Sequence, residues 1–339
     1  MLSAENVGRK RAPSVDHGLL SEFKMLDVTR CFFVTHQPQP IQDMTYDANT
    51  CLCAVARKMG IIDIYNTITW TPFLQIPGYS NYDIRRIHFH QSGLSLQTLN
   101  IITVSLNGLL LQWSLDTLAP SNKVDLSQPI WDSDIKKNLI ALALDDGSSK
   151  MLSIFDNYSI KYFLPKRNAK CLAICFSKFS TKTVFCGYSD GLVSKYMYKR
   201  KECIISISYS NSKLSIWRVI ELSQTEIVCS DSNGVVRIWD ASHGISIFEN
   251  KQSEYDVLTL CYHSGMVYAS GIDSKICAYQ RQPNGDWIVS SYIRGQSHDI
   301  HSILFIEDTL ISGGINTDIC LYPIKEGRFK DQGNGIISD

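Results

Sequence analysis

One short pattern recurs along this chain at a nearly constant interval, and it constrains the fold more than any other feature. It consists of a short apolar run, a tight turn, and an alternating run that ends in an aromatic residue. The clearest copy is SDSNGVVRIWDASHG, residues 230–244, where Asn233-Gly234 indicates a hairpin. We expect a two-residue type I′ turn there, because that turn needs positive φ at both central positions. Seven copies are marked by Gly60, Gly108, Gly147, Gly191, Gly234, Ser274 and Thr317.

The spacing of these markers predicts the architecture. Successive markers lie 48, 39, 44, 43, 40 and 43 residues apart. A period of about 40–45 residues with four strands per unit is typical of a WD-type β-propeller. We expect each hairpin to supply the two outer strands of a blade, and the inner strands to lie upstream in segments such as PIWDSDI and IHSILFI. The sequence therefore predicts an all-β fold, a single seven-bladed WD-type β-propeller.

The expected boundaries follow from the outermost repeats. Residues 1–22 are expected to form a flexible N-terminal tail, residues 23–324 the seven-bladed propeller, and residues 325–339 a C-terminal tail. We expect a strand near DVTRCFFV, residues 27–34, to close the ring by completing the blade that ends at Tyr322. The repeats are degenerate, since only the copy that ends at Trp239-Asp240 closes with a literal WD pair.

Bulk composition limits the classes of partner. Lys plus Arg and Asp plus Glu both total 33, so no global positive field favours nucleic acid, although a local basic patch remains open. The sequence lacks the roughly 18 consecutive apolar residues of a membrane span. It opens without a secretory signal, so its 11 cysteines are interpreted as reduced, buried side chains. We expect a cytosolic or nuclear protein with no membrane partner.

Motifs for catalysis and cofactor binding are weak. GYSDG, residues 187–191, fits the nucleophile-elbow pattern with Ser189 as the nucleophile, but the next residues alternate like a strand, whereas an elbow needs a helix there. The pairs His88/His90 and Cys171/Cys175 lack the further ligands that a zinc site needs. The sequence also lacks a glycine-rich phosphate loop. We therefore predict no catalytic residue, metal, cofactor or small-molecule substrate.

Two basic clusters are the candidate binding residues. They lie in LPKRNAK, residues 164–170, and YMYKRK, residues 196–201. We expect both segments to be loops on the same rim of adjacent blades, where their charges would meet. Such a patch could attract an RNA phosphate backbone or an acidic protein, or it could be solvated loop charge. The candidate residues are Lys166, Arg167, Lys170, Tyr198, Lys199, Arg200 and Lys201.

With the repeats aligned, the sequence resembles the cirhin family of WD-repeat proteins. The opening VTRCFF…PIQDMTYD, residues 28–47, is similar to that family's first strand. The most specific match is IWRVIELSQTEIVCSDSNGVVRIWD, residues 216–240, and the resemblance continues through residues 256–276, 297–303 and 310–314. It is weaker in blades two and three. The family's binding surfaces are not short motifs, so no single binding residue carries over.

The resemblance implies a non-enzymatic scaffold subunit of the small-subunit processome, in the nucleus and nucleolus. It implies the early, transcription-associated subcomplex that binds the 5′ external transcribed spacer of pre-rRNA, with other WD-propeller subunits as partners. Family members are about twice as long and carry a second propeller, so this chain corresponds to their N-terminal propeller only. The alternative is a generic WD adaptor, such as a ubiquitin-ligase substrate receptor or a signalling scaffold, without an RNA role.

Overall fold

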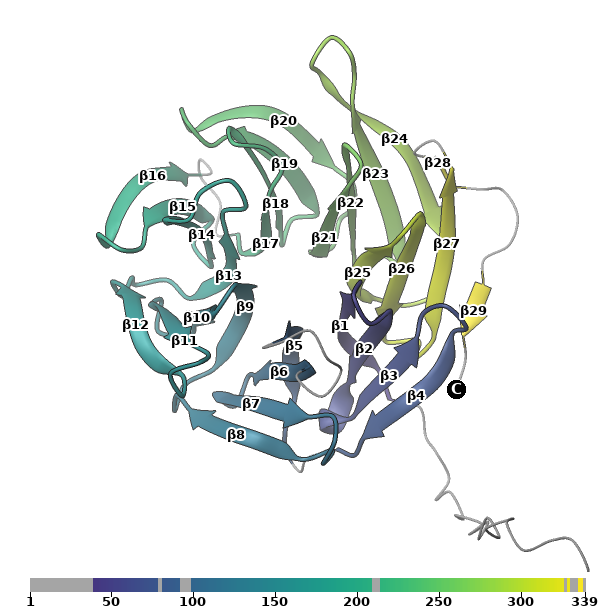
Figure 1. Cartoon of the computed structure of the whole chain (residues 1–339). Helices are drawn as coiled ribbons and strands as arrows, with labels where there is room; N and C mark the ends of the chain where they lie inside the picture. The colour runs from purple at the N-terminus through teal and green to yellow at the C-terminus, as the bar shows by residue number, and fades with distance from the viewer. Residues whose placement is uncertain are drawn as a thin grey trace, which may run out of the picture. The chain divides into compact units, whose positions relative to one another are not determined.

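In the computed structural model the chain forms a ring of antiparallel sheets (Figure 1). The structure describes residues 39–78, 81–91, 99–208, 214–325, 328–329 and 335–337. Seven sheets are present. The first strands of neighbouring sheets contact each other, and that of the seventh sheet contacts that of the first, which closes the ring. The prediction of an all-β, seven-bladed propeller is confirmed. The described helical structure is one 3-10 turn, Lys58–Gly60 (η1), and none of it is long enough to cross a membrane.

The first four blades each contain four consecutive strands. Their strands are Ile41–Asp47 (β1), Leu52–Arg57 (β2), Ile62–Asn66 (β3), Thr71–Ile76 (β4), Ile84–Gln91 (β5), Leu99–Ser105 (β6), Leu109–Ser114 (β7), Pro120–Asp125 (β8), Ile130–Lys136 (β9), Leu139–Leu144 (β10), Ser149–Ser153 (β11), Ser159–Leu164 (β12), Cys171–Phe176 (β13), Thr183–Tyr188 (β14), Leu192–Met197 (β15) and Glu202–Ser208 (β16).

Blades 5 and 6 repeat this order, and blade 7 differs at its outer edge. Their strands are Ile216–Glu221 (β17), Glu226–Asp231 (β18), Val235–Asp240 (β19), Ile245–Lys251 (β20), Val257–His263 (β21), Met266–Gly271 (β22), Lys275–Arg281 (β23), Trp287–Arg294 (β24), Ile300–Ile306 (β25), Thr309–Gly314 (β26), Ile319–Lys325 (β27), Arg328–Phe329 (β28) and Gly335–Ile337 (β29).

The outer edge of blade 7 is formed by the C-terminal part of the chain. Both β28 and β29 pair antiparallel with β27, and Ile319 lies opposite Ile337. Part of the segment expected to be a C-terminal tail is therefore paired with the sheet. The predicted closing strand at residues 27–34 and the predicted tail at residues 1–22 lie outside the described residues.

The seven hairpins are the second and third strands of their blades, so the prediction that they form the two outer strands is wrong. In blade 5, β18 and β19 flank the Gly234 turn, and β20 follows as the outer strand. Every residue of β18 is buried, because neighbouring blades cover both of its faces. The outer strand β20 is mostly exposed, so ISIFENK carries little of the apolar pattern from which a strand is predicted.

The turn in the clearest repeat also differs from the expected type. Three residues, 232–234, separate β18 from β19, and the Gly234 amide donates to the Asp231 carbonyl at 3.4 Å. Gly234 has φ +77°, whereas Asn233 is not among the residues with positive φ. The carboxylate of Asp231 accepts hydrogen bonds from the amides of Asn233 and Val235 at 2.8 and 3.0 Å. The result is a type I turn followed by one left-handed residue, in which only the last position needs glycine.

The last marker places a β-branched residue in that left-handed position, since Thr317 has φ +72°. A residue with a Cβ destabilises the folded state by roughly 1–2 kcal/mol in this conformation. Replacing it with glycine removes this strain, but glycine also makes the unfolded chain more flexible, which destabilises the fold by about 0.5–1 kcal/mol. We expect Thr317→Gly to raise the free energy of unfolding by up to about 1 kcal/mol in urea titrations. Ser274→Gly, at φ +58°, should act in the same direction. A destabilised Thr317→Gly protein would contradict this assignment.

The strand order gives the ring two distinct faces. The linker face carries the loops between blades and the turns between second and third strands: a Cβ on Gly147 would lie 2.3 Å from the Ala169 carbonyl oxygen of the next linker. The turn face carries the other two turns of each blade. There, the Tyr198 amide donates to the Lys182 carbonyl at 3.1 Å, which joins the third-to-fourth turn of blade 4 to its first-to-second turn.

Candidate nucleic-acid interface

The first predicted basic cluster lies on the linker face, in the loop between β12 and β13. Lys170 and Ser189 bind each other there: the Lys170 amide donates to the Ser189 Oγ, and the Ser189 amide donates to the Lys170 carbonyl, both at 3.0 Å. Ser189 therefore belongs to the β14–β15 turn, and strand β15 follows it. The strand-turn-helix geometry of a nucleophile elbow is absent at this position.

Carboxylates offset much of the positive charge of this linker. The Lys170 ammonium lies 2.7 Å from Asp145, and its hydrogen bond is the main cause that lowers the pKa of that carboxyl. The Arg167 guanidinium lies 4.8 Å from the centre of the Tyr188 ring and 3.9 Å from Asp190. Lys166 is exposed. These contacts give the linker mixed charge, and they stabilise the joint between blades 3 and 4.

The second predicted cluster lies on the turn face, so the prediction that both clusters share one rim is wrong. Lys199, Arg200 and Lys201 form the turn between β15 and β16, at the opposite end of β15 from the Asp190-Gly191 turn. The physical reason is the fourth strand: β16 follows this turn, whereas the sequence interpretation placed the linker to the next blade there. All three side chains are exposed, and Lys201 Nζ lies 3.4 Å from the centre of the Phe163 ring.

Tyr198 is a core residue rather than a binding residue. Its side chain is 4% exposed and packs edge-on against Tyr162 and Phe176, with ring centres 5.1 and 5.9 Å away. Its hydroxyl donates to the Thr181 carbonyl at 2.6 Å. Tyr198 therefore positions the turn next to residues 181–182 and cannot stack on a nucleobase.

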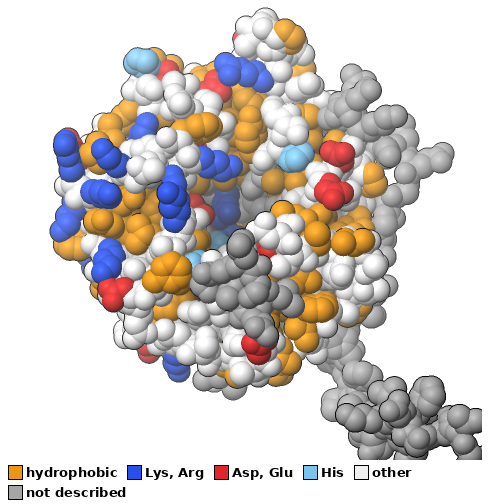
Figure 2. All heavy atoms as spheres, in the orientation of Figure 1, with side chains coloured by type: hydrophobic (Ala, Val, Ile, Leu, Met, Phe, Trp, Pro, Cys, Tyr) orange, Lys and Arg blue, Asp and Glu red, His pale blue; other side chains and the backbone are white. Residues whose placement is uncertain are grey.

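The turn face of blades 3 and 4 carries a concentration of exposed cations, which we call the basic patch. Figure 2 shows Lys and Arg side chains gathered over the side of the ring where these two blades lie. The patch consists of Lys137, Lys178, Lys182, Lys199, Arg200 and Lys201, all exposed.

Hydrogen bonds bring the three turns of the basic patch together. Lys136 Nζ, at the end of β9 and next to Lys137, donates to the carbonyls of Ser177 and Ser180 in the β13–β14 turn. Tyr198 joins the same turn to residues 199–201 through Thr181 and Lys182. The sequence interpretation missed Lys137, Lys178 and Lys182, because they are single lysines in separate turns. Their common position, just after the first strand of a blade, is the signal that could have found them.

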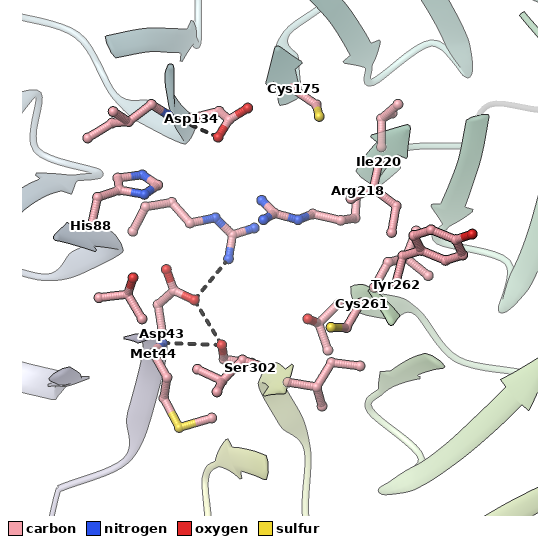
Figure 3. Close-up of a pocket in the computed structure, with 18 of the residues that line it drawn as sticks. Asp43, Met44, His88, Asp134, Cys175, Arg218, Ile220, Cys261, Tyr262 and Ser302 are labelled. Carbon is pink, nitrogen blue, oxygen red and sulfur yellow. Dashed lines mark hydrogen bonds and ion pairs between the residues drawn. The ribbon is translucent and has the colours of Figure 1, made fainter. Parts of the chain in front are cut away.

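A cavity of about 520 Å³ occupies the centre of the ring, next to the basic patch. Figure 3 shows its charged lining, with Arg218 reaching across the opening towards the side of His88 and Asp134 and with Asp43 bonded to Ser302. Lys178 contributes both to this lining and to the basic patch. The carboxylates in this wall form hydrogen bonds within the protein. Asp43, for example, accepts hydrogen bonds from the Ile87 amide at 3.1 Å and from the Ser302 hydroxyl at 2.9 Å. The cavity wall thus consists of residues that link neighbouring blades.

Asp132, two residues before Asp134 on β9, joins several blades. It is fully buried and accepts hydrogen bonds from Arg86 at 2.6 Å, Arg218 at 2.8 Å and the Ile174 amide at 2.9 Å. Burial alone would raise the pKa of its carboxyl, but the charges of Arg218 and Arg86 and the Ile174 N–H outweigh burial and lower it. Asp132 is therefore an anion that ties blades 2, 4 and 5 to blade 3.

Three histidines in or near this wall are expected to make stability depend on pH. Burial is the main cause that lowers the pKa of His88, His90 and His301. A group whose folded pKa is depressed stabilises the fold above its unfolded pKa, about 6.5, and this contribution is lost as the pH falls through the folded value. We expect the free energy of unfolding, measured in urea, to fall between pH 7.5 and pH 5.5. In His88→Gln the free energy of unfolding should decrease less over the same pH range. A decrease equal to that of the unaltered chain would show that His88 does not contribute to the pH dependence.

The described part of the chain places no three His, Cys, Asp or Glu side chains where they could hold a metal ion. Its ten cysteines, among them Cys171 and Cys175, are free thiols. The exposed lysines and the arginine of the basic patch offer positive charge to a binding partner.

Comparison with known proteins points to one group of relatives. No family model matches the chain. It is 26% identical over 336 residues to U3 small nucleolar RNA-associated protein 4 of Schizosaccharomyces pombe, covering 90% of this chain and 46% of that protein. It is 20% and 21% identical to the homologues of that protein in Mus musculus and Homo sapiens, in each case over 91% of this chain and 46% of the relative. The chain thus spans about half the length of the curated relatives it matches.

The fold itself is shared much more widely. The crystal structure of the computationally designed Ika8 protein superposes with a TM-score of 0.65 at 12% sequence identity, covering 86% of this chain and 98% of the designed one. At this identity the likeness concerns the fold alone. The similarity that bears on function is therefore the one to U3 small nucleolar RNA-associated protein 4, which extends over nine-tenths of the chain.

Proposed function

We propose that this chain acts in ribosome biogenesis, as a non-enzymatic scaffold in pre-rRNA processing. The observation that carries the proposal is its similarity, over 90% of its length, to a protein named for its association with U3 small nucleolar RNA. In this proposal the ring docks other WD-propeller subunits of the small-subunit processome and the 5′ external transcribed spacer of pre-rRNA, in the nucleolus. A closed ring of seven blades suits this role, because it holds its surface loops in fixed relative positions.

The basic patch is the surface that we assign to RNA within this function. Its cations lie on three adjoining turns. Within residues 130–208, all of which are described, the exposed carboxylates in or beside the turns of that face are those of Asp156 and Glu202. Asp156 is already paired with Lys161. The linker cluster, in contrast, has Asp145 and Asp190 beside its cations. A phosphate backbone would therefore meet a larger uncompensated positive charge on the turn face.

The cellular part of the proposal is tested by crosslinking the tagged protein in cells, sequencing the attached RNA and identifying co-purified proteins. Recovery of 5′ spacer pre-rRNA together with other propeller subunits is the expected result. Recovery of a cullin complex or a signalling complex without pre-rRNA would overturn the proposal in favour of a generic WD adaptor.

The RNA surface is tested by two triple variants that remove the same number of charges from opposite faces. We expect Lys199→Ala, Arg200→Ala and Lys201→Ala together to weaken binding of a fluorescein-labelled spacer RNA at least tenfold at low salt. Each phosphate contact contributes roughly 0.7 to the salt dependence of single-strand binding, so the log K against log[salt] slope should lose about 2 in magnitude. The measurement is fluorescence anisotropy over a series of salt concentrations.

The control is the linker-face variant with Lys166→Ala, Arg167→Ala and Lys170→Ala. Its net charge changes equally, so a nonspecific loss of attraction would weaken RNA binding in both proteins. We expect this control to bind RNA like the unaltered chain. Equal losses in the two variants, or a larger loss in the linker-face variant, would show that the basic patch is not the RNA surface.

A further inference from the structure

An exposed aromatic side chain stands within the basic patch. Phe179 is 54% exposed, and its neighbours in the β13–β14 turn are Lys178 and, three residues on, Lys182. About half of the ring is accessible to a ligand, and two cations of the basic patch lie in the same turn. An accessible aromatic ring beside lysines is the arrangement that suits contact with a nucleobase and its phosphates.

The turn that carries Phe179 is held rigidly from two sides. Glu221, at the end of β17 in blade 5, accepts hydrogen bonds from the Ser177 hydroxyl at 2.7 Å and from the Lys178 amide. From blade 3, Lys136 Nζ donates to the carbonyls of Ser177 and Ser180. Within the turn, the Ser180 amide donates to the Ser177 Oγ at 2.9 Å.

This anchoring uses buried or half-buried groups on two neighbouring blades to fix a turn whose central side chain faces solvent. A turn whose backbone is already held in place loses little conformational entropy when a partner binds to it. The Lys136 ammonium is directed at two carbonyls of the turn, whereas the exposed Lys178 and Lys182 can reach an anion in solvent. The turn thus combines an anchored backbone with an exposed aromatic ring and two flanking positive charges.

We infer that the 178–182 turn is a binding site for single-stranded RNA, in which a base stacks on Phe179 while Lys178 and Lys182 contact the flanking phosphates. The inference rests on the RNA contact proposed above and specifies its substrate class. Aromatic stacking combined with a cationic groove is the general mode by which proteins hold single strands without reading their sequence. A duplex conceals its base faces, so it could use the lysines but not Phe179.

The test is fluorescence anisotropy of the full chain with a fluorescein-labelled 12-nucleotide RNA of mixed sequence, alone and annealed to its complement. We expect the single strand to bind more tightly than the duplex. Phe179→Ala should weaken single-strand binding by about 5- to 150-fold, the range typical of losing one stacked base, and leave duplex binding unchanged. Phe179→Trp should retain single-strand binding, because the larger ring still stacks.

Phe155→Ala is the matched control. Phe155 lies in the β11–β12 turn on the same face and is 58% exposed, close to the exposure of Phe179. Its neighbour in sequence is Asp156 rather than a lysine, and its ring rests on His90 at 5.5 Å. Both substitutions remove an exposed ring of the same size, so neither should disturb folding, and Phe155→Ala should bind the single strand like the unaltered chain.

The outcomes separate this inference from the proposed function. If single strand and duplex bind equally and Phe179→Ala changes neither, the inference is wrong while the proposed phosphate contact stands. If the unaltered chain binds neither RNA, the proposed RNA contact fails together with the inference. If Phe179→Ala leaves RNA affinity unchanged but removes a co-purifying protein in cells, Phe179 docks a protein and the inference is wrong.

Discussion

Asp132→Ala is expected to lower the free energy of unfolding by about 3–5 kcal/mol, the usual cost of removing one partner from a buried ion pair. Arg86 and Arg218 donate to this carboxylate at 2.6 and 2.8 Å, and both lose it at once. Arg86 keeps Asp43 at 3.5 Å, so the larger uncompensated charge falls on Arg218. The Ile174 amide also loses its acceptor. Urea titration of the variant and the unaltered chain measures the difference.

The control for this substitution is Asp156→Ala, which removes a carboxylate paired with Lys161 on the surface. An exposed pair in high dielectric contributes little, so no measurable change in stability is expected. The contribution of Asp132 should itself depend on pH. Its folded pKa is depressed, so the contribution is complete above the unfolded value, about 3.9, and is lost as the pH falls through the folded value. A stability gap that did not narrow as the pH fell below about 3.9 would contradict an ionic role.

Gly234→Ala is expected to destabilise the ring by more than about 4 kcal/mol, at the extreme of what single substitutions do. An added Cβ would lie 2.0 Å from the Ser253 carbonyl oxygen and 2.8 Å from that of Tyr255, in the linker to blade 6. Both contacts are with backbone, which cannot rotate away as a side chain would. The carbonyl of Gly234 also accepts the Gln252 amide at 2.9 Å, so the turn cannot move without breaking the linker.

Gly265→Ala separates the clash from the backbone conformation. Gly265 has φ +80°, nearly that of Gly234, but a Cβ there would meet nothing within 4 Å. It should therefore lose only about 1 kcal/mol, because the strain of a left-handed residue with a side chain is partly offset by the smaller conformational freedom of the unfolded alanine chain. Thermal and urea unfolding of the two alanine variants give the comparison, and equal losses would show that packing against the linker is unimportant.

The number of blades was predictable because one turn in each repeat has a strict backbone requirement. All seven markers have positive φ, Ser274 and Thr317 included. The inner strands were predictable because both of their faces are buried, which gives continuous apolar runs such as CLAICF in β13. The outer strands of blades 1–6 were not, because each is paired along one edge and largely exposed. The turn type at Gly234 was missed because the Asn-Gly pair was considered alone, without the hydrogen bonds that the Asp231 carboxylate accepts from the Asn233 and Val235 amides.

The candidate site was only partly predictable, for reasons of topology. Whether Lys199 faces the same side as Lys166 depends on the number of strands between them, and the unrecognised strand β16 inverted that assignment. The burial of Tyr198 depends on a hydrogen bond to Thr181, 17 residues away. Lys137 and Lys182 lie on the same face only because consecutive blades repeat the same strand order. The local sequence shows which residues are charged and which segment carries them. The face of the ring on which a turn lies can be assigned only once every strand before it is known.

The placement of the two cationic clusters at opposite ends of β15 has an electrostatic consequence. The strand has six residues and is thus about 20 Å long. At physiological ionic strength the screening length is about 8 Å, so charge neutralised at one end is scarcely felt at the other. An acidic ligand docked beside Lys166 would therefore change the attraction at Lys199 only slightly. Electrostatic coupling between ligands on the two faces is expected to be weak at physiological ionic strength and to grow as the salt concentration is lowered.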